Sequence, residues 1–123
     1  MAFLTDRKRA EGMGAAKSGA EHHWHMTISS VALTILVPLF LFTFGSILGS
    51  SYDEVVAYYQ RPFPAIVAAL TFGVGFMHFK SGVQVLIEDY IHGALRQPLL
   101  LAMICLSYTL AGIGIFAVAR IAL

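Results

Sequence analysis

The chain has 123 residues, of which 58% are hydrophobic and 12% are charged, and its formal net charge is +1. A soluble domain carries roughly a quarter charged residues, so this chain has too little polar surface to cover itself in water. The composition therefore predicts an integral membrane protein covered by lipid or by a partner protein within lipid, and the near-neutral charge argues against a nucleic-acid partner.

Residues 1–25 are polar or mixed in character and hold much of the charge. A secretory signal places a short apolar run directly after a basic start, and this tail lacks that order. We therefore expect a cytoplasmic N-terminal tail. The tail ends in EHHWH at residues 21–25. Adjacent histidines do not share one helical face and no second cluster of such ligands follows, so these residues are expected at the membrane interface rather than around a metal.

Three apolar runs follow the tail, each long enough for the helix of about 20 residues that crosses the hydrocarbon. The expected spans are about 26–48, 63–90 and 98–119, and they make residues 26–123 the membrane anchor domain. Pro38 lies inside the first span, where membrane helices tolerate proline if neighbouring groups satisfy the freed carbonyl. Pro98 suits the first turn of the third. The predicted fold class is all-α, a bundle of three transmembrane helices.

The connections between the spans carry signals of their own. Ser51 followed by Glu54 has the spacing of a capping box, which predicts a short interfacial helix between the first two spans. Tyrosines in the same connection suit the boundary between membrane and water. The connection at residues 91–97 is short, so the second and third helices should be antiparallel neighbours.

Lysine and arginine residues in short flanking segments indicate the orientation, because they concentrate on the cytoplasmic side. The tail and the second connection hold five of them: Arg7, Lys8, Arg9, Lys17 and Arg96. The other side holds Arg61 and Arg120. The N-terminus is therefore expected in the cytoplasm.

The second span carries His78, and an ionisable residue within a span is a candidate functional residue by default. At about 100° per residue, Gly75, Gly82, Val85 and Asp89 share a helical stripe with His78. Glycines one turn before and after the histidine clear the surface beside the ring, which suits a flat macrocycle ligated by imidazole. Packing between helices, with a hydrogen-bonded histidine, is the competing interpretation, and spacing alone leaves both open.

Asp89 and Tyr90 lie about 17 Å further along the same helix. A phenol at that depth can donate a hydrogen bond to a quinone carbonyl, and a neighbouring carboxylate can orient a basic group or relay protons. The same pair also suits an ordinary membrane interface. Lys80, two positions after His78, should point to the opposite side of the helix.

Residues 78–90, HFKSGVQVLIEDY, resemble the second-helix motif of the small cytochrome b membrane anchor of succinate dehydrogenase (respiratory complex II). That motif has a histidine, a glycine four residues on, a QV(L/I) segment, and an Asp-Tyr pair eleven and twelve residues after the histidine. All are present. The number of spans, the cytoplasmic N-terminus and the chain length match as well, so the resemblance covers nearly the whole chain.

The resemblance implies a role for each matching residue. His78 would be an axial ligand of a b-type haem, and therefore of its iron, with the second ligand supplied by a partner, the second cytochrome b anchor of the complex. Gly75 and Gly82 would leave clearance for that haem. Tyr90 would hydrogen-bond the headgroup of ubiquinone, the substrate, and Asp89 would organise the basic residues around it.

The resemblance also implies partners and a location. Electrons would arrive from an iron–sulfur subunit, fed by a flavoprotein subunit that oxidises succinate. The chain would be a non-catalytic, multi-pass subunit of the bacterial inner membrane that completes the quinone site and forms a larger anchor with the second cytochrome b anchor.

One departure from the family concerns the haem propionates. The family commonly carries an arginine near a propionate at the start of the first helix, where this chain has Met26 or Thr27. The side chains that can take its place are those of His22, His23, His25 and Lys17.

Two alternatives stay open. The first is a haem-b anchor of a related quinol:fumarate reductase. The second is a structural membrane subunit without a redox group, in which His78 is a packed, hydrogen-bonded side chain. A transporter is disfavoured because three helices without an internal repeat make a poor transport path.

Overall fold

The computed structural model describes residues 5–12, 14 and 19–123, and every regular element in that part of the chain is helical. Three helices are long and apolar enough to cross a membrane, which confirms the predicted all-α fold with three transmembrane helices. They are α2 (Gly19–Gly45), α4 (Pro62–Tyr90) and α5 (Arg96–Ala122). Short helices accompany them: α1 (Asp6–Glu11), α3 (Tyr52–Tyr59) and the 3₁₀ turn η1 (Gly93–Leu95).

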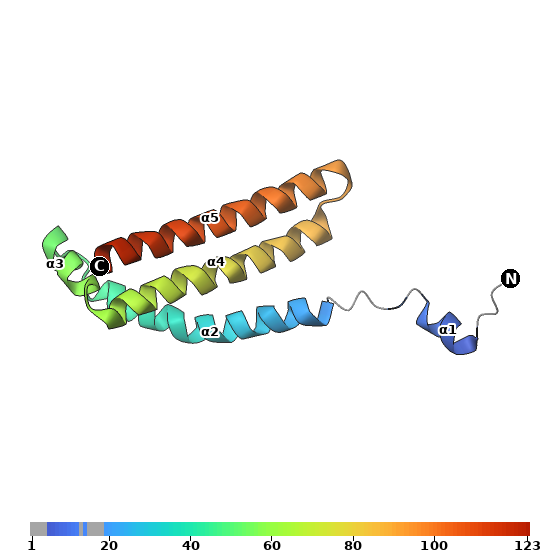
Figure 1. Cartoon of the computed structure of the whole chain (residues 1–123), viewed down its shortest axis with the longest axis horizontal. Coiled ribbons are helices and arrows are strands. Elements are labelled where there is room, and N and C mark those ends of the chain that lie inside the picture. Colours follow the sequence, from blue (N-terminus) through green and yellow to red (C-terminus); the bar gives the residue numbers. More distant parts are fainter. Residues whose placement is uncertain (1–4, 13, 15–18) are drawn as a thin grey trace.

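Helix α4 lies between α2 and α5 (Figure 1). It packs along both neighbours, whereas within the described residues no backbone contact joins α2 to α5. The three helices therefore form a row rather than a closed triangle, and this chain leaves two faces of α4 uncovered. Consecutive long helices run in opposite directions, so the short connection at residues 91–97 does join antiparallel neighbours, as predicted.

The helices differ from the expected spans most of all at the start of α2. This helix begins at Gly19 rather than near residue 26, so the histidine-rich stretch is part of it. Glu21 lies in the first turn, where a carboxylate is favourable at the positive end of the helix dipole, and its carboxylate lies 3.8 Å from Nε2 of His25. Helix α2 then continues unbroken through Pro38.

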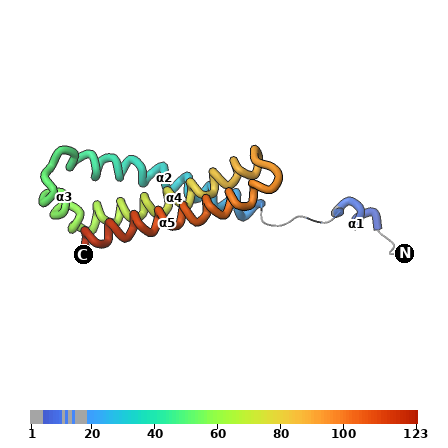
Figure 2. Tube along the Cα trace, turned by 90° about the horizontal axis from the view of Figure 1, so that it is seen from above, coloured from blue at the N-terminus to red at the C-terminus, as the bar shows by residue number. Residues whose placement is uncertain are grey.

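A small buried cluster lies where α3 meets the long helices, at the end of the row opposite to the start of α2 (Figure 2). It consists of Ile47, Tyr59 and Ala68, with partly buried neighbours around it. Most other large apolar side chains are exposed, and Phe42 retains 78% of its accessible surface. Such a surface is stable only when it is covered by lipid or by another protein chain.

Helix α3 confirms the short helix predicted from its capping box between the first two spans. The backbone N–H of Ser51 donates to the Glu54 carboxylate at 2.8 Å, and the Ser51 hydroxyl donates to the same oxygen at 2.9 Å. These two hydrogen bonds, the backbone one foremost, lower the pKa of Glu54 because they stabilise its charged form.

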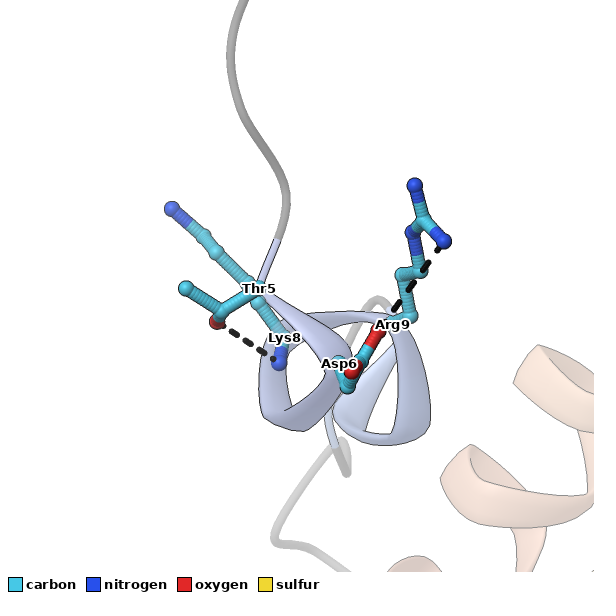
Figure 3. Close-up of polar contacts among 4 residues, drawn as sticks. All are labelled: Thr5, Asp6, Lys8 and Arg9. Atoms are coloured by element: carbon cyan, nitrogen blue, oxygen red, sulfur yellow. Dashed lines mark hydrogen bonds and ion pairs between the residues drawn. The ribbon is translucent and has the colours of Figure 1, made fainter.

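The N-terminal tail contains a short helix, α1, that the composition of the tail does not reveal. Thr5 caps it, because its hydroxyl oxygen accepts from the backbone N–H of Lys8 at 3.3 Å (Figure 3). Asp6 and Arg9, one turn apart, form an exposed ion pair at 3.9 Å. Exposed pairs of this kind add little stability, so the helix depends mainly on its cap.

Candidate functional site

His78 lies on α4 with its side chain partly buried and directed toward α2. Its Nδ1 atom lies 2.9 Å from Oγ of Ser29, a hydrogen bond that ties the two helices together. The Ser29 hydroxyl also donates to the Met26 carbonyl one turn earlier, at 2.9 Å. The imidazole is therefore held in one orientation by a polar contact at membrane depth.

Gly75 and Gly82 flank His78 along α4, one turn before it and one turn after it. A Cβ atom built on either glycine would meet no other heavy atom within 4 Å. Gly114 on α5 is different, because a Cβ there would lie 2.8 Å from the Phe72 ring. Gly114 therefore serves helix packing within the chain, whereas Gly75 and Gly82 leave an open surface beside the histidine.

A groove of about 380 Å³ opens between α2 and α4 next to His78. Its polar side chains are those of His22, His25, Ser29, Lys80 and Ser81, and its apolar side chains are those of Ile28, Ala32, Val74 and Met77. The Nε2 atom of His22 is buried and has no hydrogen-bond partner among the described residues. An unpaired buried nitrogen is costly, so this atom is a candidate contact for a group from outside the chain.

Lys80 follows His78 by two residues, and its side chain lines the same groove as Ser29 while it reaches toward α5. Its Nζ atom lies 5.9 Å from the centre of the Tyr108 ring on α5, in a cation–π contact. The Tyr108 ring is therefore a partner for Lys80 that the sequence did not identify. Glu88, the acidic residue nearest to Lys80 on α4, instead accepts a hydrogen bond from Gln84 at 3.0 Å.

Asp89 and Tyr90 end α4 and are exposed, and Tyr90 retains 80% of its accessible surface. Neither side chain makes a hydrogen bond within the part of the chain that the structure describes. Arg96 begins α5 after the short connection, and its Nε atom is buried without a partner among the same residues. The chain thus presents a phenol, a carboxylate and a guanidinium near the connection between α4 and α5, and any enclosing walls must come from elsewhere.

The structure therefore groups His78 with Gly75 and Gly82 and keeps Asp89 and Tyr90 apart from them at the helix end. Ser29 was not among the predicted residues, because nothing in the sequence shows which residue of α2 lies level with His78. The unpaired atoms of His22 and Arg96 were not predictable either. Of the residues considered for a propionate, His22 and His25 line the groove, and Lys17 lies outside the described residues.

Comparison with known proteins gives consistent matches over the chain. A family model described as "Succinate dehydrogenase/Fumarate reductase transmembrane subunit" matches residues 2–116. The chain is 40% identical to the succinate dehydrogenase hydrophobic membrane anchor subunit of Paracoccus denitrificans over 123 residues, which are 100% of this chain and 95% of the relative. It is 31% identical to the protein of the same description from Rickettsia bellii over 106 residues, 82% of each chain. No solved structure gives a significant match.

Proposed function

The chain belongs to the family of succinate dehydrogenase/fumarate reductase transmembrane subunits, and from that membership we propose that it anchors a succinate dehydrogenase, helps hold a b-type haem and completes a ubiquinone-reduction site. Succinate rather than fumarate is favoured because the relatives named above are described as succinate dehydrogenase subunits. The observation that carries the haem assignment is the open surface that Gly75 and Gly82 leave beside the oriented imidazole of His78.

The residues present fit one half of a haem site. His78 offers an imidazole nitrogen, which is a common axial ligand of haem iron. A side chain at Gly75 or Gly82 would stand in the space beside the ring, and glycine leaves that space free. The unpaired Nε2 atom of His22 supports a propionate contact at the start of α2, in place of the arginine that the family commonly has there. When bound, the haem supplies a one-electron carrier between the iron–sulfur subunit and the quinone.

The second axial ligand is assigned to the partner protein, the second cytochrome b anchor. The surface at Gly75 and Gly82 is open although His78 contacts α2, so a helix of that partner can approach beside the His78 ring. The many exposed apolar side chains of this chain are consistent with such a partner and with lipid around it.

Tyr90 and Asp89 are assigned to the quinone site. The Tyr90 hydroxyl donates a hydrogen bond to a carbonyl oxygen of the quinone ring, which withdraws electron density and favours reduction. Asp89 orients a cationic group, and Arg96 is the candidate in this chain because its guanidinium has a buried nitrogen without a partner among the described residues. Both Asp89 and Tyr90 are exposed at one helix end, so the second cytochrome b anchor and the iron–sulfur subunit are expected to enclose the quinone.

A purely structural role is the second candidate, and the Ser29 contact is the observation that favours it. Polar side chains commonly hydrogen-bond across helices within membranes without further function. In that case His78 joins α2 to α4 and binds no metal. The two candidates differ in a property that can be measured directly, the optical spectrum of the complex.

The test is a reduced-minus-oxidised spectrum of the purified native complex and of three variants. His78→Ala should remove the b-type signal from an assembled complex. Gly82→Leu should also reduce it, because a Cβ at this position meets no other heavy atom within 4 Å and the rest of the side chain extends into the haem space. His92→Ala, which changes an exposed histidine on the connection to α5, is the matched control and should leave the spectrum unchanged. An unaltered b signal in assembled His78→Ala complex would remove His78 from the ligand role.

A further inference from the structure

The Ser29 hydroxyl carries one proton, and its neighbours determine where that proton points. The Ser29 oxygen lies 2.9 Å from the carbonyl oxygen of Met26 and 2.9 Å from Nδ1 of His78. A carbonyl oxygen can only accept a hydrogen bond. The bond between Ser29 and Met26 therefore uses the hydroxyl proton, and the Ser29 oxygen is left with lone pairs facing the imidazole.

The opposite arrangement is unfavourable. If the Ser29 proton pointed at Nδ1 of His78, the oxygens of Ser29 and Met26 would face each other at 2.9 Å with no proton between them. Two partially negative atoms at that distance repel, and the repulsion is weakly screened inside a membrane protein. The network is satisfied when His78 donates its Nδ1–H to Ser29. A neutral imidazole protonated at Nδ1 has its free lone pair on Nε2.

We propose that Ser29 is a positioning residue for the haem ligand: it fixes His78 in the Nδ1–H tautomer and presents the Nε2 lone pair to the iron. This inference rests on the haem role of His78 given above. Ligating histidines generally donate their other ring N–H to an oxygen acceptor, which orients the ring and raises the basicity of the ligating nitrogen. Here the acceptor comes from α2. The position of α2 along α4 therefore determines which tautomer the His78 imidazole adopts.

Ser30 supplies the comparison that separates this role from ordinary helix chemistry. Its hydroxyl donates to the same Met26 carbonyl at 2.8 Å, but it is exposed and has no contact with His78. Bonding back to the preceding turn is therefore common to both serines. Among the described residues, the Ser29–His78 contact is the side-chain hydrogen bond that joins α2 to α4.

The experiment measures the haem midpoint potential and the haem content of the purified complex carrying Ser29→Ala, Ser29→Thr or Ser30→Ala. Ser29→Ala should raise the potential, because an imidazole that no longer donates through Nδ1 is a weaker base and stabilises ferric iron less. It should also weaken haem retention about 10-fold. Ser29→Thr keeps a hydroxyl acceptor and Ser30→Ala leaves the acceptor untouched, so both should match the wild type.

Two outcomes overturn the inference and leave the proposed function intact. The first is an unchanged potential and haem content in Ser29→Ala while His78→Ala loses the b signal. The second is an equal change in Ser29→Ala and Ser30→Ala, which would assign the effect to α2 alone. A b signal that survives in His78→Ala would instead overturn the proposed function. If Ser29→Ala fails to assemble, Ser29→Cys replaces it, because a thiol is a weak acceptor and should shift the potential in the same direction.

Discussion

Tyr90 presents its phenol at the end of α4 with 80% of its surface exposed. Such a hydroxyl makes no contribution to packing in this chain, so its removal should affect only what binds there. Tyr52, on α3 at the opposite end of the row, is equally exposed at 80%. Tyr90 and Tyr52 have the same phenol and the same exposed fraction, and they differ only in their location. Tyr52 is therefore a control for substitutions at Tyr90.

Tyr90→Phe should lower ubiquinone reduction about 2- to 10-fold, the effect of one hydrogen bond of about 0.5–1.5 kcal/mol. Succinate oxidation by an artificial dye should be unchanged, because the dye takes electrons before they reach the quinone. Tyr52→Phe should alter neither rate. Equal loss of both activities in Tyr90→Phe would indicate faulty assembly and contradict the assignment.

Glu54 gives a prediction about pH at the scale of a single side chain. Its pKa is lowered by the hydrogen bonds from Ser51, so the cap contributes fully at pH values above the ordinary glutamate pKa of about 4.3. The contribution is lost as the pH falls through the lowered pKa of the folded state. Glu54→Ala should therefore speed hydrogen exchange of the α3 amides at neutral pH, and its difference from the wild type should shrink in acid.

Asp53→Ala is the control for that experiment. Asp53 shares the first turn of α3 but is not part of the capping box, so its loss should speed exchange less than the loss of Glu54. A difference between Glu54→Ala and the wild type that persists unchanged at low pH would contradict the capping role, because the protonated side chain is a much weaker acceptor.

At the scale of the elements, α4 and α5 pack tightly where Gly114 meets Phe72. A Cβ atom at Gly114 would lie 2.8 Å from the base of the Phe72 ring. The Phe72 atoms nearest the backbone cannot move away unless α4 moves with them. Overpacking of this kind costs about 1–3 kcal/mol. Gly112, two residues earlier on α5, has no heavy atom within 4 Å of such a Cβ.

Gly114→Ala should accordingly lower the apparent Tm of the solubilised complex, and Gly112→Ala should leave it nearly unchanged. Thermal unfolding of the two variants side by side checks this. Equal Tm values would mean that α4 and α5 pack at a different register, in which Gly114 does not face Phe72.

The spacing of residues along one helix was sufficient to predict the His78 stripe, because a regular helix fixes the direction of every side chain on it. The start of α2 was not predictable in the same way. The polar residues 19–25 form the first turns of α2 instead of preceding the helix. A membrane helix can extend into water because its backbone hydrogen bonds are maintained there, and an acidic first turn complements its dipole.

For the whole molecule, the row of three helices has the consequence that the chain covers little of its own surface. Two faces of α4 and most large apolar side chains are open. A protein of this shape requires lipid or a partner protein to cover it, which agrees with membership of a family of transmembrane subunits. His78 itself faces α2 through Ser29, and the open surface beside it is the one at Gly75 and Gly82.

The orientation of the row can be tested with single cysteines. Cys105 is the one cysteine of the chain, so Cys105→Ala gives a clean background. In intact cells an impermeant thiol reagent should label Ser50→Cys, in the connection before α3, and should label His92→Cys, between α4 and α5, only after the inner membrane is opened. The reverse pattern would place the N-terminus outside the cytoplasm.

The sequence by itself determined the all-α class, the three spans, the capped helix α3 and the stripe that joins His78 to its glycines. These features depend on hydrophobic length and helical period, which are local properties of the chain. Only the tertiary structure decided that α4 is central, that Ser29 meets His78, and that Gly114 is packed while Gly75 and Gly82 are open. Those contacts depend on which helices approach and at what height, and no short stretch of sequence contains that information.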